Sequence, residues 1–523
     1  MSSLSASARP ALRAAEEGDH GVLVELLADL DLRSEPAAQA WRVALQAYRW
    51  LAMPKKGSLP TIDVLRGLGD SLEEREALGF ACVALERAAV LSFDGQALGE
   101  LVALHASVSE GHPELALRLE LARLWSVLFA GSPSSELEER AREAAVAGHE
   151  LALPDLVVET TAARAFGALV RQDLPYATAL ARRASRMGRT EGLPQSEYLA
   201  NLVLARVRRS AGQAHLATRI LSALARVVPE GWRAWLAWER QLAGASGEVL
   251  PASSQALASL LEAAQRAHPP AFAAAQQELM HKLQHATPMR SEAEVVVALV
   301  GGFGEPESAV SWLRGVDAGI PLGLHGLALA HGPPDALALV SCRPGESPRR
   351  LLAVGQSLLP SDHTYVHSER PGRVESAIAT LALAGPEGLD DEEFFLRVYG
   401  FRFAERRHAG TMNVLLHRVR SRLEDVAELG REGRRLSLRA HRAFVVPDPR
   451  CNAPTGDQIL RLVATRTRCT AKEAAEALGL PLRTVQHTLQ RLADEGACAA
   501  GRQGRRIEYR VEDTTFREAT NVR

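Results

Sequence analysis

Apolar side chains recur every three or four residues through most of the first 285 positions of the chain. The segments 36–51, 113–129, 135–151 and 154–170 show this helical period, and Pro, Gly or Ser residues separate successive segments. Because short breaks favour antiparallel neighbours, the pattern predicts helical hairpins from about residue 8 to residue 285. Ser135 and Glu138 have the spacing of a capping box, which predicts a helix start at Ser135.

Three tryptophans stand three residues apart in the later part of this region, at Trp232, Trp235 and Trp238. On a helix this spacing winds only slowly around the axis, so the indoles could line a groove as partner-binding residues for a peptide or another ligand. Packing between helices is the alternative.

The pattern changes after residue 290. The stretch 294–300 is β-branched and apolar, 307–314 has a helical period, and 322–329 and 336–340 fit either a helix or a strand. Residues 301–304 contain the glycines of a phosphate-binding loop, but no Gly-Lys-Ser/Thr motif follows them. We therefore describe 291–345 as a connecting region of uncertain fold.

Short strands at 350–354 and 364–367 precede three predicted helices, at 374–384, 391–399 and 411–425. The third helix has an apolar stripe formed by Met412, Leu416, Val419 and Leu423. Its outward side chains are Thr411, Asn413, His417, Arg418, Ser421 and Arg422.

The stretch 470–511 predicts a helix, a turn, a second helix and a basic hairpin. Thr470 and Glu473 have capping-box spacing, Gly479 ends the first helix, and Pro481 can open the second. The second helix has an apolar stripe of Leu482, Val485, Leu489 and Leu492. Its polar face carries Arg483, Thr484, Gln486, His487, Gln490 and Arg491, which can hydrogen-bond base edges or phosphates. Residues 497–500 and 505–511 can pair around the turn 501–504, and so present Arg502, Arg505 and Arg506.

Charge is distributed unevenly along the 523 residues, although the net charge is only −2. Residues 401–450 contain 12 arginines and 6 acidic residues, and residues 461–510 contain 10 basic and 5 acidic residues. The two remaining C-terminal pieces contribute −1 each, so the first 400 residues carry a net charge of −11. An acidic body with a basic end suits a polyanionic partner at that end, although a solvated basic surface is the alternative.

The composition indicates a soluble, non-enzymatic protein of a reducing compartment. Five cysteines without a paired spacing argue against a disulfide framework or a metal site, and no catalytic motif is present. The N-terminus lacks a signal-peptide core, and the most apolar tract, 320–340, is interrupted by histidine, proline and aspartate. We expect a cytoplasmic protein with no cofactor and no membrane partner.

The run LGLPLRTVQHTLQRLADEGACAAGRQGRRIEYRV resembles the turn, recognition helix and wing of MarR/ArsR-like winged-helix domains. Pro481 stands where this family usually has serine or threonine. TMNVLLHRVRSRLED and DDEEFFLRVYG are similar to the recognition helix and preceding helix of the OmpR/PhoB-type winged helix, although Leu415 replaces a common histidine. Alternatives are a small helical domain with a polar face for the last domain and a purely structural winged helix for the preceding one.

The segment 198–229 resembles a tetratricopeptide repeat through Leu204, Ala205, Gly212, Ala217, Leu221 and Pro229. Neighbouring segments do not keep a 34-residue period, so the resemblance implies an irregular α-solenoid. A compact helical domain of another type is the alternative.

Together, these patterns predict a mainly α protein with an irregular α-solenoid of tetratricopeptide-like hairpins at 1–290, the connecting region, an OmpR/PhoB-like winged helix at 346–450 and a MarR/ArsR-like winged helix at 451–523. The expected function is a bacterial-type transcriptional regulator that binds double-stranded DNA and receives a protein, peptide or small-molecule signal through its repeats. The alternative is an interaction scaffold without sequence-specific DNA binding. The oligomeric state stays open, with a dimer among the options.

The residues expected to contact DNA are Arg483, Thr484, Gln486, His487, Gln490, Arg502, Arg505 and Arg506, and in the preceding domain Thr411, Asn413, His417, Arg418, Arg422 and Arg439.

Overall fold

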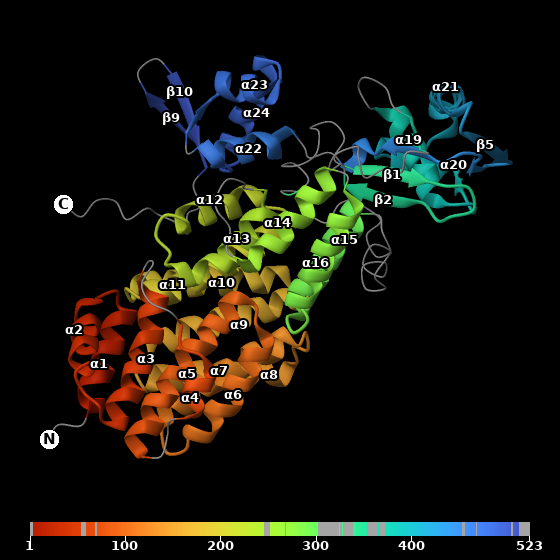
Figure 1. Cartoon of the computed structure of the whole chain (residues 1–523). Helices are drawn as coiled ribbons and strands as arrows, with labels where there is room; N and C mark the ends of the chain where they lie inside the picture. Colours follow the sequence, from red (N-terminus) through yellow and green to blue (C-terminus); the bar gives the residue numbers. More distant parts are fainter. Residues whose placement is uncertain are drawn as a thin grey trace.

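The chain is mainly helical in a computed structural model, with small sheets toward its C-terminus (Figure 1). The structure describes residues 4–53, 59–67, 71–244, 252–266, 268–301, 324, 327, 338–352, 363–366, 372–451, 455–466, 468–503 and 506–511. The predicted helix at 307–314, most of 322–329 and Arg505 lie outside these residues. The expectation of a mainly α protein is confirmed.

Residues 4–301 form a helical body (Figure 1). Its first helices are α1 (Leu4–Glu16), α2 (Gly21–Leu30), α3 (Pro36–Ala52), α4 (Ile62–Arg66), α5 (Leu72–Ser92) and α6 (Gly95–Val108). Its middle helices are α7 (Pro113–Phe129), α8 (Ser135–Glu150), α9 (Pro154–Val170), α10 (Leu174–Thr190), α11 (Pro194–Ser210) and α12 (Ala214–Leu224). Its last elements are the 3-10 helix η1 (Glu230–Trp232) and the helices α13 (Arg233–Leu242), α14 (Ala252–Gln265), α15 (Pro269–Lys282) and α16 (Thr287–Gly301).

The middle of the body repeats every 40 or 41 residues. Helices α7, α9 and α11 each have 17 residues and begin with a proline at the first helical position. Proline suits this position because its missing N–H has no partner inside the helix. Two residues before each proline, the backbone has positive φ, at Gly111, Ala152 and Gly192. The hairpins are therefore regular, with a period longer than the 34 residues of a tetratricopeptide repeat.

The first helices of the body contact the later elements α11 and η1. The side-chain amide of Gln195 on α11 donates to the carbonyl oxygen of Ala15 at 3.3 Å, and the indole of Trp232 donates to the carbonyl oxygen of Leu51 at 2.9 Å. These hydrogen bonds join residues 180 and 181 positions apart. One apolar core runs from Ala8 on α1 to Val300 on α16, so the hairpins close into a compact body.

Residues 338–451 form the first C-terminal unit (Figure 1). Its elements are β1 (Ala338–Cys342), β2 (Arg349–Leu352), β3 (Thr364–Tyr365), α19 (Arg373–Ala384), β4 (Leu389–Asp390), α20 (Asp391–Tyr399), α21 (Glu405–Leu423), β5 (Ala427–Glu432), β6 (Arg435–Ala440), β7 (Phe444–Pro447) and η4 (Pro449–Cys451). One sheet has the order β2-β1-β7-β3, in which only the β3–β7 pair is parallel, and the other has the order β4-β6-β5. Phe394, Phe395 and Phe444 are fully buried in its core.

Residues 455–511 form the last unit. Its elements are α22 (Thr455–Arg466), β8 (Cys469–Thr470), α23 (Ala471–Leu478), α24 (Leu482–Asp494), β9 (Ala499–Gln503) and β10 (Arg506–Arg510), and its sheet has the order β8-β10-β9. The elements from α19 to β6 follow the same sequence of helix, short strand, two helices and a hairpin. In both units the second strand of the hairpin lies in the middle of the sheet. The part of the first unit from α19 to β6 therefore has the same topology as the last unit.

Most predicted helix boundaries agree with the structure, and the exceptions have local causes. Ser134, one residue earlier than expected, caps α8, because its hydroxyl accepts the Leu137 N–H at 3.1 Å. Helix α21 begins at Glu405, six residues before the expected start. The β-branched stretch 294–300 is helical in α16, because Val295, Val296, Val297 and Val300 pack in the body core.

The local structure predicted for the last unit agrees with the structure except at the start of α24 and in the hairpin. Thr470 and Glu473 form the predicted capping box, and Gly479 ends α23 with a left-handed φ of 62°. Pro481 is the N-cap of α24 and lies just outside it, so the helix starts at Leu482, whose side chain is exposed and does not join the buried stripe. The hairpin pairs Gln503 with Arg506 and Arg502 with Ile507, so residues 501–503 belong to β9 and not to the expected turn.

Candidate nucleic-acid interface

The last unit presents one face of α24 to solvent. Val485, Leu489 and Leu492 are buried as predicted, and Thr488 is buried beside them. The exposed side chains are Leu482, Arg483, Thr484, Gln486, His487, Gln490, Arg491 and Asp494. The recognition residues predicted from the helical period therefore share one outer face, which is what groove contact requires.

Side chains on this face differ in whether they already have partners. Gln490 donates to Asp494 Oδ1 at 2.9 Å, and Arg491 forms an ion pair with Glu495 at 2.8 Å. Within the described part of the chain, Arg483, Gln486 and His487 form no hydrogen bond or ion pair. These three side chains come from the first half of α24 and keep their donors and acceptors available for another molecule.

The hairpin after α24 adds positive charge. Arg502 on β9 and Arg506 on β10 are exposed and lie close to the turn, while Arg505 falls outside the described residues. Tyr509 of β10 is buried in the unit's core and anchors the hairpin to the helices. Arginine side chains at the tip of an anchored hairpin can reach phosphates without disturbing the core.

The first C-terminal unit presents a similar face on α21. Met412, Leu415, Leu416, Val419 and Leu423 are buried, and the exposed side includes Thr411, Asn413, His417, Arg418 and Arg422. Thr411, Asn413, His417 and Arg418 have no hydrogen bond or ion pair among the described residues. Leu415 faces the core, so its departure from the histidine of the resembling family does not remove an outward group.

The hairpin of this unit is held by acidic residues of α20. Arg431 of β5 is 2.7 Å from the buried carboxylate of Asp391. Arg434 lies 3.5 Å from Glu392 and 3.8 Å from Glu405, so it is shared between α20 and α21. Arg439 of β6 is exposed and stands opposite Glu428 in the sheet. Arg439 is thus available to solvent, whereas Arg431 and Arg434 tie the hairpin to the helices.

The tryptophans proposed as partner-binding residues lie in the core. Trp232, Trp235 and Trp238 are 0%, 0% and 1% exposed. The Trp235 indole donates to Glu239 Oε1 at 3.2 Å and the Trp238 indole donates to Glu292 Oε2 at 3.2 Å. The groove hypothesis is wrong for these residues, because other helices of the body cover the indoles of η1 and α13.

Glu239 and Glu292 belong to a buried charge network that sequence patterns did not reveal. Glu239 lies 2.7 Å from Arg206 and 2.8 Å from Arg209, and Glu292 lies 3.1 Å and 2.6 Å from the same two arginines. Burial alone would raise the pKa of Glu292, but Arg206 and Arg209 outweigh it and hold the pKa at about 2. The network joins α11, α13 and α16.

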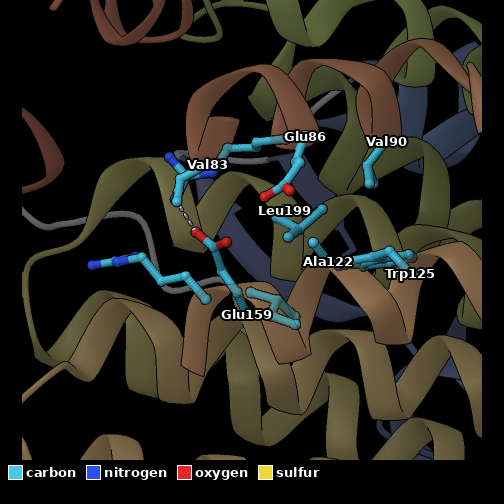
Figure 2. A pocket seen from close by; sticks show the side chains of 10 residues that line it. Val83, Glu86, Val90, Ala122, Trp125, Glu159 and Leu199 are labelled. Carbon is cyan, nitrogen blue, oxygen red and sulfur yellow. Dashed lines mark hydrogen bonds and ion pairs between the residues drawn. The ribbon is translucent and has the colours of Figure 1, made fainter. Parts of the chain in front are cut away.

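A second buried charge cluster surrounds a small cavity in the middle of the body (Figure 2). The cavity has a volume of about 30 Å³, and the carboxylates of Glu86 and Glu159 point into it. Arg87 lies 2.8 Å from Glu16 and 2.5 Å from Glu159, and Arg118 lies 2.8 Å from Asp155. A space of this size holds one or two water molecules, so it is too small for an organic ligand.

Glu159 holds its proton unusually firmly in this cluster. Burial is the largest cause that raises its pKa, Arg87 and Ser196 lower it, and the neighbouring carboxylates Glu16 and Asp155 raise it, so that the pKa is about 7. Arg87 and Arg118 face four carboxylates here, those of Glu16, Glu159, Asp155 and Glu114, so one proton relieves part of the excess negative charge.

We expect Glu159→Gln to reduce the pH dependence of stability. The folded-state pKa of Glu159 is above its usual 4.5, so its stabilising contribution is complete below pH 4.5 and is lost as pH rises through about 7. When the pH rises from mildly acidic to mildly alkaline, the free energy of unfolding of the wild type should fall by about 2–3 kcal/mol more than that of the variant. Urea unfolding across this range measures the difference. The exposed Glu143→Gln is the control, and an equal slope in Glu159→Gln and wild type would refute the assignment.

Comparison with protein-family models, curated proteins and solved structures finds no match to the chain. The described residues contain no group of three or more His, Cys, Asp or Glu side chains arranged to hold a metal ion. None of the helices in the described ranges is long and apolar enough to cross a membrane. The two exposed polar faces, on α21 and α24, are the features of the described residues that bear on function.

Proposed function

We propose that this chain is a DNA-binding transcriptional regulator of the bacterial type, which uses tandem winged helices to bind double-stranded DNA. The observation that carries the proposal is the outer face of α24, where Arg483, Gln486 and His487 have no partner among the described residues. Arginine can pair with guanine, and glutamine with adenine, through two hydrogen bonds each. A buried stripe on the opposite face fixes the helix so that these side chains keep one direction.

The shared topology of the two units supports the winged-helix assignment. Each has a helix and a short strand followed by two helices, and then a hairpin whose second strand joins the short strand. This order and the buried stripes agree with the resemblance to MarR/ArsR-like and OmpR/PhoB-type domains. The helix that precedes each hairpin, α21 or α24, would enter the major groove, and the arginines of the hairpins would contact the backbone.

The helical body is proposed as the part that receives a protein, peptide or small-molecule signal in the cytoplasm. Its helical hairpins support a tetratricopeptide-like repeat array, although their period is 40 or 41 residues rather than 34, and its first helices contact α11 and η1 through Gln195 and Trp232. Because its tryptophans are buried, a partner would use other surfaces of the repeats.

Salt dependence of DNA binding tests this function. The full chain should bind a duplex of about 30 base pairs. If it makes six or more phosphate contacts, raising the salt concentration from about 50 to about 200 mM should weaken binding by about 1,000-fold. Fluorescence anisotropy measures the affinity, and Arg142→Ala on the body should leave the slope unchanged. A chain that binds no duplex at low salt would favour the alternative, an interaction scaffold.

A further inference from the structure

The last unit is held by the C-terminal end of α13. Arg461 on α22 donates from Nη2 to the carbonyl oxygen of Gly244 at 2.7 Å, and Gly244 follows the C-cap of α13. A cation at this end of a helix is favourable, because the unpaired carbonyls carry partial negative charge. Alongside it, α22 packs on α12, and Leu216 of α12 joins the core of the last unit.

The first C-terminal unit is held by α16. Strand β2 packs beside α16, and Ala338 of β1 belongs to the apolar core of the body. The N–H of Asp448 donates to the carbonyl oxygen of Ala338 at 2.8 Å, which ties the end of the unit to the same place. Asp448 also binds Arg450, whose Nη1 donates to Thr380 of α19 at 2.6 Å.

The two helices that hold the C-terminal units, α13 and α16, are linked inside the body. Helix α13 contributes Glu239 and helix α16 contributes Glu292, and both carboxylates contact Arg206 and Arg209 of α11. Arg209 and Glu239 have fully buried side chains. Breaking such a buried pair is costly, so α13 and α16 should keep a constant relative position.

We propose that the helical body, through the charge network that links α13 and α16, holds the two C-terminal units in one fixed arrangement. The DNA partner is then a duplex with two half-sites at one preferred separation. The inference rests on the proposed function. The contacts of Arg461, Leu216 and Ala338 with the body select one arrangement of the two units. A signal that moves α13 relative to α16 would change the preferred separation.

The test compares the full-length wild type with Arg461→Met/Leu216→Ala. A two-half-site duplex is first selected from a random library with the wild type, and its spacer is then varied one base pair at a time. The wild type should bind the best spacing about 100-fold more tightly than a spacing changed by half a helical turn. In the double variant this preference should fall below about threefold, while the affinity for a single half-site stays unchanged. Arg466→Met, exposed on the same helix, is the matched control.

Two results would overturn the inference while leaving the proposed function intact. They are a wild type that binds duplex without any spacing preference, and a double variant that keeps the wild-type preference. Absence of duplex binding by the wild type would instead refute the proposed function.

Hydrogen exchange examines the docking without DNA. The amides of α12 and α22 should exchange about tenfold faster in the double variant than in Arg466→Met, because local opening no longer breaks the interface. Equal exchange in both proteins would show that Arg461 and Leu216 do not hold the last unit, and the inference would then fail.

Discussion

Replacing Arg483, Gln486 and His487 together with alanine is expected to weaken binding to a selected duplex by about 100- to 1,000-fold. Each side chain that pairs with a base edge contributes about 1–3 kcal/mol of discrimination, and each 1.4 kcal/mol corresponds to about tenfold in affinity. All three side chains are exposed, so the variant should fold normally. Anisotropy titrations with the selected duplex and with a scrambled duplex measure the loss.

The matched control changes three exposed polar residues on a helix of the body. Arg140→Ala/Arg142→Ala/Glu143→Ala on α8 alters the same number of solvent-facing side chains and should retain full affinity. Loss of less than about threefold in the α24 variant would mean that this face does not read bases. Equal loss for selected and scrambled duplexes would mean that it contacts only the backbone.

Arg209→Met is expected to lower the free energy of unfolding of the helical body by about 3–5 kcal/mol, because it leaves buried carboxylates without one of their cations. Arg209 is 0% exposed and lies 2.8 Å from Glu239 and 2.6 Å from Glu292. Urea unfolding followed by far-UV circular dichroism measures the change. Arg186→Met, exposed on α10, is the control and should change stability by less than about 0.5 kcal/mol.

A second variant separates charge from packing. In Arg209→Met/Glu292→Met, one cation and one anion are removed together, so a large part of the lost stability should return. If the double variant is less stable than Arg209→Met by more than about 1 kcal/mol, packing by the side-chain stems outweighs the charge balance.

Helix positions followed from the sequence where the chain carries strong local signals. Pro113 and Pro154 mark first helical positions, and Asp390 caps α20 through the Glu393 N–H, so these starts were predicted correctly. The start of α21 was not predicted correctly, because residues 405–410 contain two arginines, a histidine and a glycine and show no apolar period. The stretch 294–300 shows the opposite case, in which packing in the body core overrides a β-branched composition.

The exposed faces of α21 and α24 were predictable, because an apolar stripe of helical period identifies the buried side of a helix and leaves the opposite side to solvent. The burial of the tryptophans was not predictable, since a spacing of three residues fits both a solvent-facing groove and a buried contact between helices. The charge networks were also hidden from the sequence. Arg87 meets Glu16 and Gln195, which lie 71 and 108 positions away, and no local pattern relates such residues. The docking of Arg461 on Gly244 spans 217 positions for the same reason.

The closure of the helical body has a consequence for its synthesis. Ala15 and Leu51 accept hydrogen bonds from residues 180 and 181 positions later. At about 5–20 residues per second, a ribosome needs about 10–40 s to extend the chain by that length. During that interval Arg87 lacks its partner Gln195 and the Leu51 carbonyl lacks the Trp232 indole, so the newborn chain leaves polar groups unpaired that the finished protein pairs and buries. The final closure of the body must therefore follow the emergence of α11 and η1 from the ribosome.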